Sequence, residues 1–322
     1  MKKALWIFCL ASLALAVPVF ANGTPETTGG KGIRIGILQK SRSDQYQIIL
    51  NTAQETVLRS LKKDGKISDY YQFDADVDVQ KQLNQADDLI AMKVNVIVMS
   101  TTDAYGCAPI VTKCKEAGIP LVIVNAQTVN ADEAAAIVAS DDVYAGEIMG
   151  NYIINRLGGK GKARGNVLQL EGDIGNTSQM GRDTGLKNTV YKEPGLKVLE
   201  SLTAKWNRDE AMRITEDWLQ KYPNISAIAA ENDNMAMGAL NAVINAGRKG
   251  SIISIGVDAI EDALLSIKNG ELDATVFQNG KAQGQTSIEV AYAIATGQPY
   301  EKRTMIPFEL ITKDNVADFL KK

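Results

Sequence analysis

The sequence of 322 residues contains no histidine and only three cysteines. The lack of histidine excludes Ser-His-Asp and Cys-His catalysis and makes a zinc site improbable. The net charge of −3 gives no electrostatic basis for binding nucleic acid, which requires a basic patch. What remains is an ordinary soluble composition, in a chain long enough for two domains with separate cores.

Long apolar runs are also missing, apart from one near the N-terminus. Lys2 and Lys3 precede the apolar segment 4–17, and small residues follow it up to Ala21. This order predicts a signal peptide over residues 1–21, and the run is too short for a good transmembrane span. We therefore expect export to the periplasm, with a flexible lead over residues 22–31.

Two cysteines, Cys107 and Cys114, remain after removal of the signal peptide. They fall in segment 103–117, which has helical spacing and in which Asp103 is the expected N-cap. At a rise of about 1.5 Å per residue, their Cα atoms would be about 10 Å apart, beyond disulfide reach. We expect two free, mostly buried thiols.

Strand and helix patterns alternate along the rest of the chain. Parallel sheets covered on both faces are the architecture that this alternation predicts, here as two doubly wound α/β lobes. The expected strands are 33–38, 70–73, 94–99, 121–124, 134–139, 167–170, 198–202, 226–230, 252–257, 274–277 and 305–311. The clearest helices are 45–61, 77–92, 141–157 and 280–296.

Several expected strands end in a carboxamide or a carboxylate. These ends are Gln39, Asn125, Glu171, Glu231, Asp258 and Gln278. In open α/β sheets, ligands bind outside the carboxyl ends of the strands. The pattern therefore predicts a ring of hydrogen-bonding groups around a polyhydroxylated ligand. Glu171 has no partner acid or nucleophile, so we expect binding without catalysis.

Some of the candidates have a structural alternative. Asp44 either accepts hydrogen bonds from sugar hydroxyls or caps the helix that follows it. Tyr46 and Trp206 either lie against the C–H face of a sugar ring or pack in the core. Arg182 either forks onto ligand oxygens or forms an ion pair with Asp183 or a neighbour.

The segment after residue 230 poses a similar choice. Asp233 is the expected N-cap of the next helix, which leaves Asn232 free for a ligand. Gln278 either binds the ligand or serves as a hinge. The segment 158–162 is rich in Gly and Lys, but it follows a helix and precedes a strand, so we interpret it as a solvated loop rather than a phosphate loop.

Motifs along the whole mature chain carry a family resemblance. They are residues 34–37 with Asp44 and Tyr46, residues 204–206, residues 232–238 and residues 256–259. In this combination and order the chain resembles the type I periplasmic sugar-binding proteins of ABC transporters, and most of all their glucose/galactose-binding members.

The resemblance implies two lobes that close around a ligand by a hinge of three strands. The N-terminal lobe would comprise residues 32–140 plus 279–308, and the C-terminal lobe residues 141–278 plus 309–322, with crossovers near Ser140, Gln278 and Phe308. No cofactor, metal or catalytic residue is implied. The implied ligand contacts are Lys40, Asp44, Tyr46, Asn125, Asn176, Ser178, Arg182, Trp206, Asn232, Asp258 and Gln278.

Departures from the family pattern bear on the ligand. Lys40 replaces an aromatic residue, Asn176 and Ser178 replace histidine and aspartate, and the calcium loop is replaced by residues 157–162. Ala126 stands where ribose binders carry arginine. A hexose such as glucose or galactose is the expected ligand, with an inositol, a pentose or a modified sugar as alternatives. Lys40 also raises the alternative of an anionic sugar.

The resemblance implies a monomer that delivers a monosaccharide to a membrane ABC permease. A sensory subunit for a chemoreceptor or a sensor kinase would use the same pocket and stays open. A sugar-responsive repressor would need a helix-turn-helix segment before residue 33, where the export signal stands instead.

Overall fold

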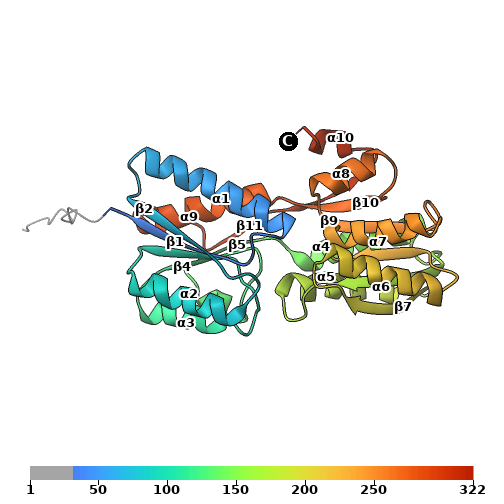
Figure 1. Ribbon diagram of the computed structural model, residues 1–322, viewed down its shortest axis with the longest axis horizontal. Coiled ribbons are helices and arrows are strands. Elements are labelled where there is room, and N and C mark those ends of the chain that lie inside the picture. The colour runs from blue at the N-terminus through green and yellow to red at the C-terminus, as the bar shows by residue number, and fades with distance from the viewer. Residues whose placement is uncertain (1–31, 322) are drawn as a thin grey trace, which may run out of the picture. The chain divides into compact units, whose positions relative to one another are not determined.

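The computed structural model describes residues 32–321, which form two α/β lobes, each built on a six-stranded sheet (Figure 1). The signal peptide and the lead expected over residues 1–31 lie outside the described residues. The strand order is β11-β5-β4-β3-β1-β2 in the first sheet and β12-β10-β9-β8-β6-β7 in the second. The predicted fold class is confirmed.

The first sheet consists of β1 (Arg34–Gln39), β2 (Asp69–Asp74), β3 (Val96–Met99), β4 (Leu121–Val124), β5 (Ala136–Ala139) and β11 (Arg303–Met305). Its helices are α1 (Gln45–Lys63), α2 (Val79–Ala91), α3 (Ala108–Glu116), the short η1 (Ala131–Glu133) and α9 (Gly280–Ala295). Strands with successive buried residues, such as β3 and β4, are typical of a parallel sheet covered on both faces.

The second sheet consists of β6 (Gly165–Glu171), β7 (Leu196–Thr203), β8 (Ala227–Ala230), β9 (Ile253–Asp258), β10 (Ala274–Gln278) and β12 (Phe308–Thr312). Its helices are α4 (Asp142–Arg156), α5 (Thr177–Asn188), the short η2 (Val190–Lys192), α6 (Arg208–Lys221), α7 (Asp233–Asn245), α8 (Glu261–Lys268) and α10 (Val316–Phe319).

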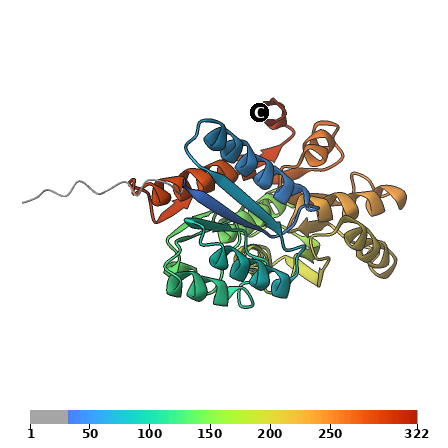
Figure 2. The same cartoon turned by 60° about the vertical axis from the view of Figure 1, so that its left-hand side comes forward.

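Alternate residues of each strand enter opposite cores. In the first lobe, Val96 and Val98 pack under α1 and α9, whereas Ile97 and Met99 pack under α2 and α3. The helices α1 and α9 are distant in sequence, yet they lie side by side over one face of this sheet (Figures 1 and 2). The period of two therefore fixes which helices cover which face.

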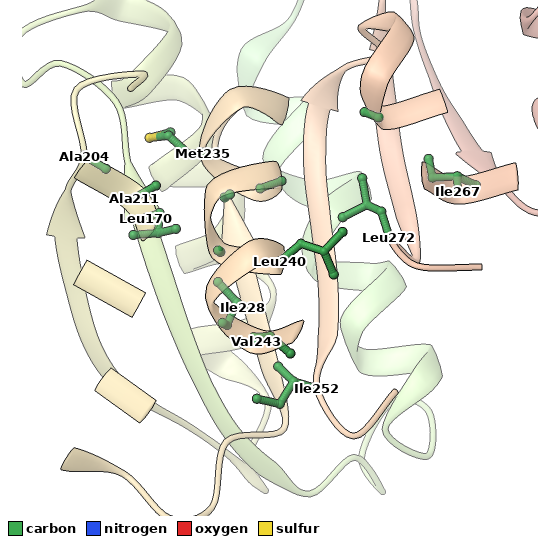
Figure 3. Close-up of a cluster of buried hydrophobic side chains, with 14 of the residues drawn as sticks. Leu170, Ala204, Ala211, Ile228, Met235, Leu240, Val243, Ile252, Ile267 and Leu272 are labelled. Atoms are coloured by element: carbon green, nitrogen blue, oxygen red, sulfur yellow. The ribbon is translucent and has the colours of Figure 1, made fainter. Parts of the chain in front are cut away.

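The second lobe follows the same rule. Ala227 and Ala229 of β8 face the core under α4 and α5, and Ile228 faces the core under α6, α7 and α8. Figure 3 shows Leu240 and Val243 of α7 packed over Ile228 in that second core. Burial of these side chains holds the strand ends, and the polar residues that follow them, in place.

The predicted strand 305–311 is wrong, because two strands occupy this stretch. β11 pairs in parallel with β5 in the first sheet, and β12 pairs antiparallel with β10 in the second. Between them lies Pro307, which has no N–H to continue a ladder. The chain thus passes between the sheets three times: after β5, after β10, and between β11 and β12.

The predicted cap at Asp103 is also wrong. Its carboxylate accepts hydrogen bonds from the N–H groups of Tyr105 and Gly106, which closes a turn, and α3 begins only at Ala108. Cys107 and Cys114 are free and buried, as predicted. Within residues 32–321, no helix is both long and apolar enough to span a membrane.

Candidate ligand-binding site

A cavity of about 540 Å³ lies at the carboxyl ends of strands from both sheets. Its volume falls in the range of small-molecule sites, about 300–1,000 Å³. Three strand-end residues of the predicted ring, Gln39, Glu171 and Glu231, do not line it. All of the ligand contacts that the family resemblance implies do line it, and they come from both lobes. They are Lys40, Asp44, Tyr46, Asn125, Asn176, Ser178, Arg182, Trp206, Asn232, Asp258 and Gln278.

Asp44 and Tyr46 form the start of α1 and part of the cavity wall. Asp44 is the N-cap of α1, because its Oδ1 accepts from the backbone N–H of Gln47 at 2.8 Å. Tyr46 packs in the core of the first lobe, and its hydroxyl donates to Gln283 of α9 at 2.9 Å. Both residues therefore have the structural role considered above, and both also line the cavity.

Two asparagines cap helices at the opposite wall. The Oδ1 of Asn176 accepts from the N–H of Ser178, and the Oδ1 of Asn232 accepts from the N–H of Met235 at 2.9 Å. The prediction that Asp233 caps α7 is wrong. Asp233 is instead the first helical residue, where its buried carboxylate accepts from the Thr275 hydroxyl and the Ile260 N–H.

Arg182 lies at the centre of the site and is held on three sides. Its Nε donates to Asp142 at 3.0 Å, its Nη1 to the backbone carbonyl of Glu231, and its Nη2 to the Oε1 of Gln278 at 2.9 Å. An ion pair is therefore present, but its partner is Asp142, whereas Asp183 pairs with Lys187. Arg182 thus fixes the side chain of Gln278, which follows from its planar array of five donors.

The carboxamides of Asn125 and Gln278 are oriented by the protein. Gln47 donates to the Oδ1 of Asn125 at 3.3 Å, and Ser100 in turn holds Gln47 at 3.1 Å. Since Arg182 donates to the Oε1 of Gln278, the carboxamide oxygens of both residues already accept a hydrogen bond within the protein. Among the described residues, the Nε2 of Gln278 is buried without a hydrogen-bond partner. These two residues therefore offer N–H donors, which suit ligand oxygens.

Trp206 rests on a glycine. A Cβ atom at Gly172 would come within 2.0 Å of the indole ring, so only glycine leaves room for the ring there. The Lys40 ammonium and the Arg182 guanidinium each lie 5.6 Å from the centre of the ring, a distance typical of cation–π contacts. In the described chain, the indole Nε1 is buried without a partner.

Unusual backbone conformations concentrate at the cavity. Five of its lining residues have positive φ although none is glycine: Val77, Asn125, Lys205, Trp206 and Asp258. Trp206 has φ 59°, and Val77, a β-branched residue, has φ 60°. Such conformations cost about 1–3 kcal/mol each and persist where the surroundings impose them, most often at ligand sites.

The carboxylates of the cavity are perturbed by burial. Desolvation raises the pKa of Asp44, against the backbone hydrogen bond from Gln47, and raises the pKa of Asp258 well above its ordinary value, against the charge of Arg182. Desolvation likewise raises the pKa of Tyr46 well above its ordinary value. Both carboxylates line the cavity, where they can accept hydrogen bonds from a ligand.

Three further residues that shape the site were not among those predicted from the sequence. Gln47 orients Asn125, Gly172 lies beneath Trp206, and Asp173 forms an ion pair with Lys40 at 3.7 Å. Gln47 falls one helical position after Tyr46, and only this proximity to a candidate could have drawn attention to it. Gly172 and Asp173 follow β6 directly, so the strand-end rule applied one and two residues beyond Glu171 would have found them.

Two α/β lobes and a polar cavity lined by both of them define the class of two-lobed solute-binding proteins. The family model for the periplasmic binding protein domain matches residues 35–299, and the chain belongs to this family. A putative rhizopine-binding protein from Rhizobium meliloti is 33% identical over 316 residues, which cover 96% of this chain and 97% of that relative.

Two further relatives span the same length. The ribose import binding protein of Bacillus subtilis is 31% identical over 320 residues, or 97% of this chain and 100% of that protein. The structure of an ABC transporter solute binding protein from Bacillus halodurans with bound myo-inositol superposes with a TM-score of 0.85 at 32% identity, covering 91% of this chain and 99% of that chain. The type I fold is therefore shared along the whole described chain.

Proposed function

We propose that this protein captures a polyol ring of monosaccharide size in the cavity and delivers it, unchanged, from the periplasm to a membrane ABC permease. Binding without chemistry follows from the lining, which offers carboxylates and oriented carboxamides and no activated nucleophile. The observation that carries the proposal is the pairing of donors at Asn125 and Gln278 with acceptors at Asp44 and Asp258 around one cavity. A hydroxyl both donates and accepts, so a polyol satisfies both sets.

Two aromatic walls favour a ring over an open chain. Tyr46 and Trp206 lie on the first and second lobe respectively, and both line the cavity. The C–H faces of a six-membered ring can lie against them, which buries apolar area while the hydroxyls point to the polar groups. Myo-inositol is the first candidate, because the similar structure from Bacillus halodurans holds it.

A hexose such as glucose or galactose is the second candidate. It presents the same ring size and the same pattern of hydroxyls, and the family motifs around Asp44, Trp206 and Asp258 point to it. Ribose is the weaker candidate, since Ala126 replaces the arginine expected of ribose binders.

A thermal-unfolding panel with myo-inositol, hexoses, pentoses and linear polyols tests the proposal. A ligand present at about 100 times its dissociation constant should add about 2.7 kcal/mol to the free energy of unfolding. Stabilisation by myo-inositol or a hexose, ahead of ribose, supports the proposal. If no polyol raises the unfolding temperature, the proposal is wrong.

A transport role and a sensory role predict different effects of deleting the gene. Deletion of the gene should abolish uptake of the radiolabelled ligand if the protein serves a permease. A sensory role predicts intact uptake with loss of the chemotactic or transcriptional response to that ligand.

We expect the protein to act as a monomer, which size-exclusion chromatography with light scattering can check.

A further inference from the structure

The charges around the cavity are distributed unevenly. Three lining cations each have an acid within 4.0 Å: Lys40 with Asp173, Arg182 with Asp142, and Arg208 with Asp262. A fourth, Lys205, is exposed to solvent. Among the described residues, no cation lies within 4.0 Å of the carboxylates of Asp44 or Asp258. A ligand therefore meets unpaired acids and no unpaired buried cation.

The pair of Lys40 and Asp173 joins the two lobes. Lys40 follows β1 of the first sheet, and Asp173 follows β6 of the second. Their side chains are 9% and 26% exposed, and the ammonium also faces the Trp206 ring at 5.6 Å. At this degree of burial the attraction between the two charges is stronger than it would be in water.

The segment that carries Asp173 is held by the first lobe at two more points. The N–H of Ala104 donates to the carbonyl of Gly175 at 3.1 Å, and the N–H of Gln127 donates to the Thr177 hydroxyl at 2.8 Å. These contacts fix segment 173–177 against the first lobe. Asp173 is thus held beside Lys40 by more than the ion pair itself.

We propose that Asp173 makes the cavity selective for uncharged polyols, because it occupies and neutralises Lys40, the only lysine within residues 32–321 that is buried and lines the cavity. This inference rests on the proposed function and narrows its ligand class. A uronic or aldonic acid would bring a carboxylate next to Asp173 and into a cavity that already holds Asp44 and Asp258. Like charges at such distances oppose binding.

In this proposal Asp173 is a specificity-determining residue, and Lys40 does not bind an anionic ligand because its charge is paired with Asp173. Removal of the Asp173 charge should convert Lys40 into an unpaired ammonium with three free donors in the cavity. Such a group binds carboxylates well, so the preference between neutral and acidic sugars should shift.

The test compares D-glucuronate with D-glucose and myo-inositol by calorimetric titration, using glucuronate as a competitor where its own heat is small. The wild-type protein should bind glucose or myo-inositol roughly tenfold more tightly than it binds glucuronate, or more. In Asp173→Asn, glucuronate affinity relative to the neutral ligand should rise by roughly tenfold or more. Because the same two ligands are compared in both variants, any difference in affinity that comes from the rings themselves cancels when the affinity ratio of the variant is divided by that of the wild type.

Two controls isolate the ion pair. Asp132→Asn makes the same chemical change at a side chain that is 86% exposed and paired with Arg303 outside the cavity, and it should leave the ratio unchanged. In a Lys40→Gln background, Asp173→Asn should no longer increase the relative affinity for glucuronate, because the freed ammonium is absent.

Distinct results overturn the two proposals. If the wild type binds glucuronate as tightly as the neutral ring, or if Asp173→Asn changes the ratio no more than Asp132→Asn does, Asp173 does not set the charge preference, and the proposed function stands. If the wild type binds no neutral polyol at all, the proposed function and this inference both fail.

Discussion

Replacement of Asp44 by asparagine should weaken ligand binding and leave the stability of the protein unchanged. Asp44 does two things at once: it caps α1 through its Oδ1, and it presents a carboxylate to the cavity. Asparagine caps a helix about as well as aspartate does. The substitution therefore removes the charge in the cavity and keeps the cap.

The magnitude follows from the two roles. A hydrogen bond to a charged group contributes about 1.5–3 kcal/mol, and a neutral one about 0.5–1.5 kcal/mol. Asp44→Asn should thus cost about 1–2 kcal/mol of binding free energy, or roughly 5- to 30-fold in dissociation constant. Asp44→Ala should cost more binding and, in addition, about 1 kcal/mol of the free energy of unfolding through loss of the cap.

Asp78 supplies a matched control. It caps α2 with the same geometry, accepting from the N–H of Lys81 at 2.8 Å, and it does not line the cavity. Asp78→Ala should lower the free energy of unfolding by about 1 kcal/mol, measured by urea titration, with no change in calorimetric affinity. Unchanged affinity in Asp44→Asn would reduce Asp44 to a helix cap, and a large loss of stability in that variant would refute the separation of the two roles.

Three other predictions address the ring, the buried acid and the thiols. Trp206→Phe should abolish the ligand-induced change in tryptophan fluorescence, whereas Trp218→Phe in the core should retain it; a persistent signal in the first variant would show that Trp206 does not meet the ligand. Burial raises the pKa of Asp233 from 3.8 to about 7, so the folded protein holds a proton that the unfolded chain loses between about pH 4 and pH 7. Its contribution to the free energy of unfolding is complete below that range and lost as the pH rises through it, so Asp233→Asn should flatten this part of the profile in urea titrations at pH 5 and pH 8; an unchanged slope would contradict it. Cys107 and Cys114 are buried, and desolvation raises the pKa of Cys114 to about 12, so a thiol reagent should label the folded protein only at its rate of unfolding, and fast labelling would refute the burial.

Much of the architecture could be predicted, because buried parallel strands leave a strong sequence signal. The strand over 121–124 matches β4 at both ends, and most others differ by one or two residues. The exceptions depend on single local contacts. Pro307 separates β11 from β12 within one apolar stretch, and Asp103 closes a turn well before α3 begins.

Part of the cavity lining could be predicted from strand ends and from the family resemblance, yet the role of each residue could not. Asn232 and Asp233 are adjacent and chemically similar, and the choice of cap depends on Thr275, which lies 42 residues further along the chain and holds the Asp233 carboxylate. The partner of Lys40 likewise lies on the other lobe. Such pairs depend on the packing of distant segments, which leaves no mark in the local sequence.

The strands β11 and β12 also bear on how the protein folds. Each sheet takes an edge strand from the last part of the chain, and the first sheet further depends on α9 to cover one of its faces. Neither lobe is a continuous stretch of sequence, so neither can complete its sheet while the ribosome is still making residues before 303. Neither lobe can therefore reach its final form until the last part of the chain is available, and loss of the segment from Arg303 to Thr312 would leave two unfinished sheets with open edges.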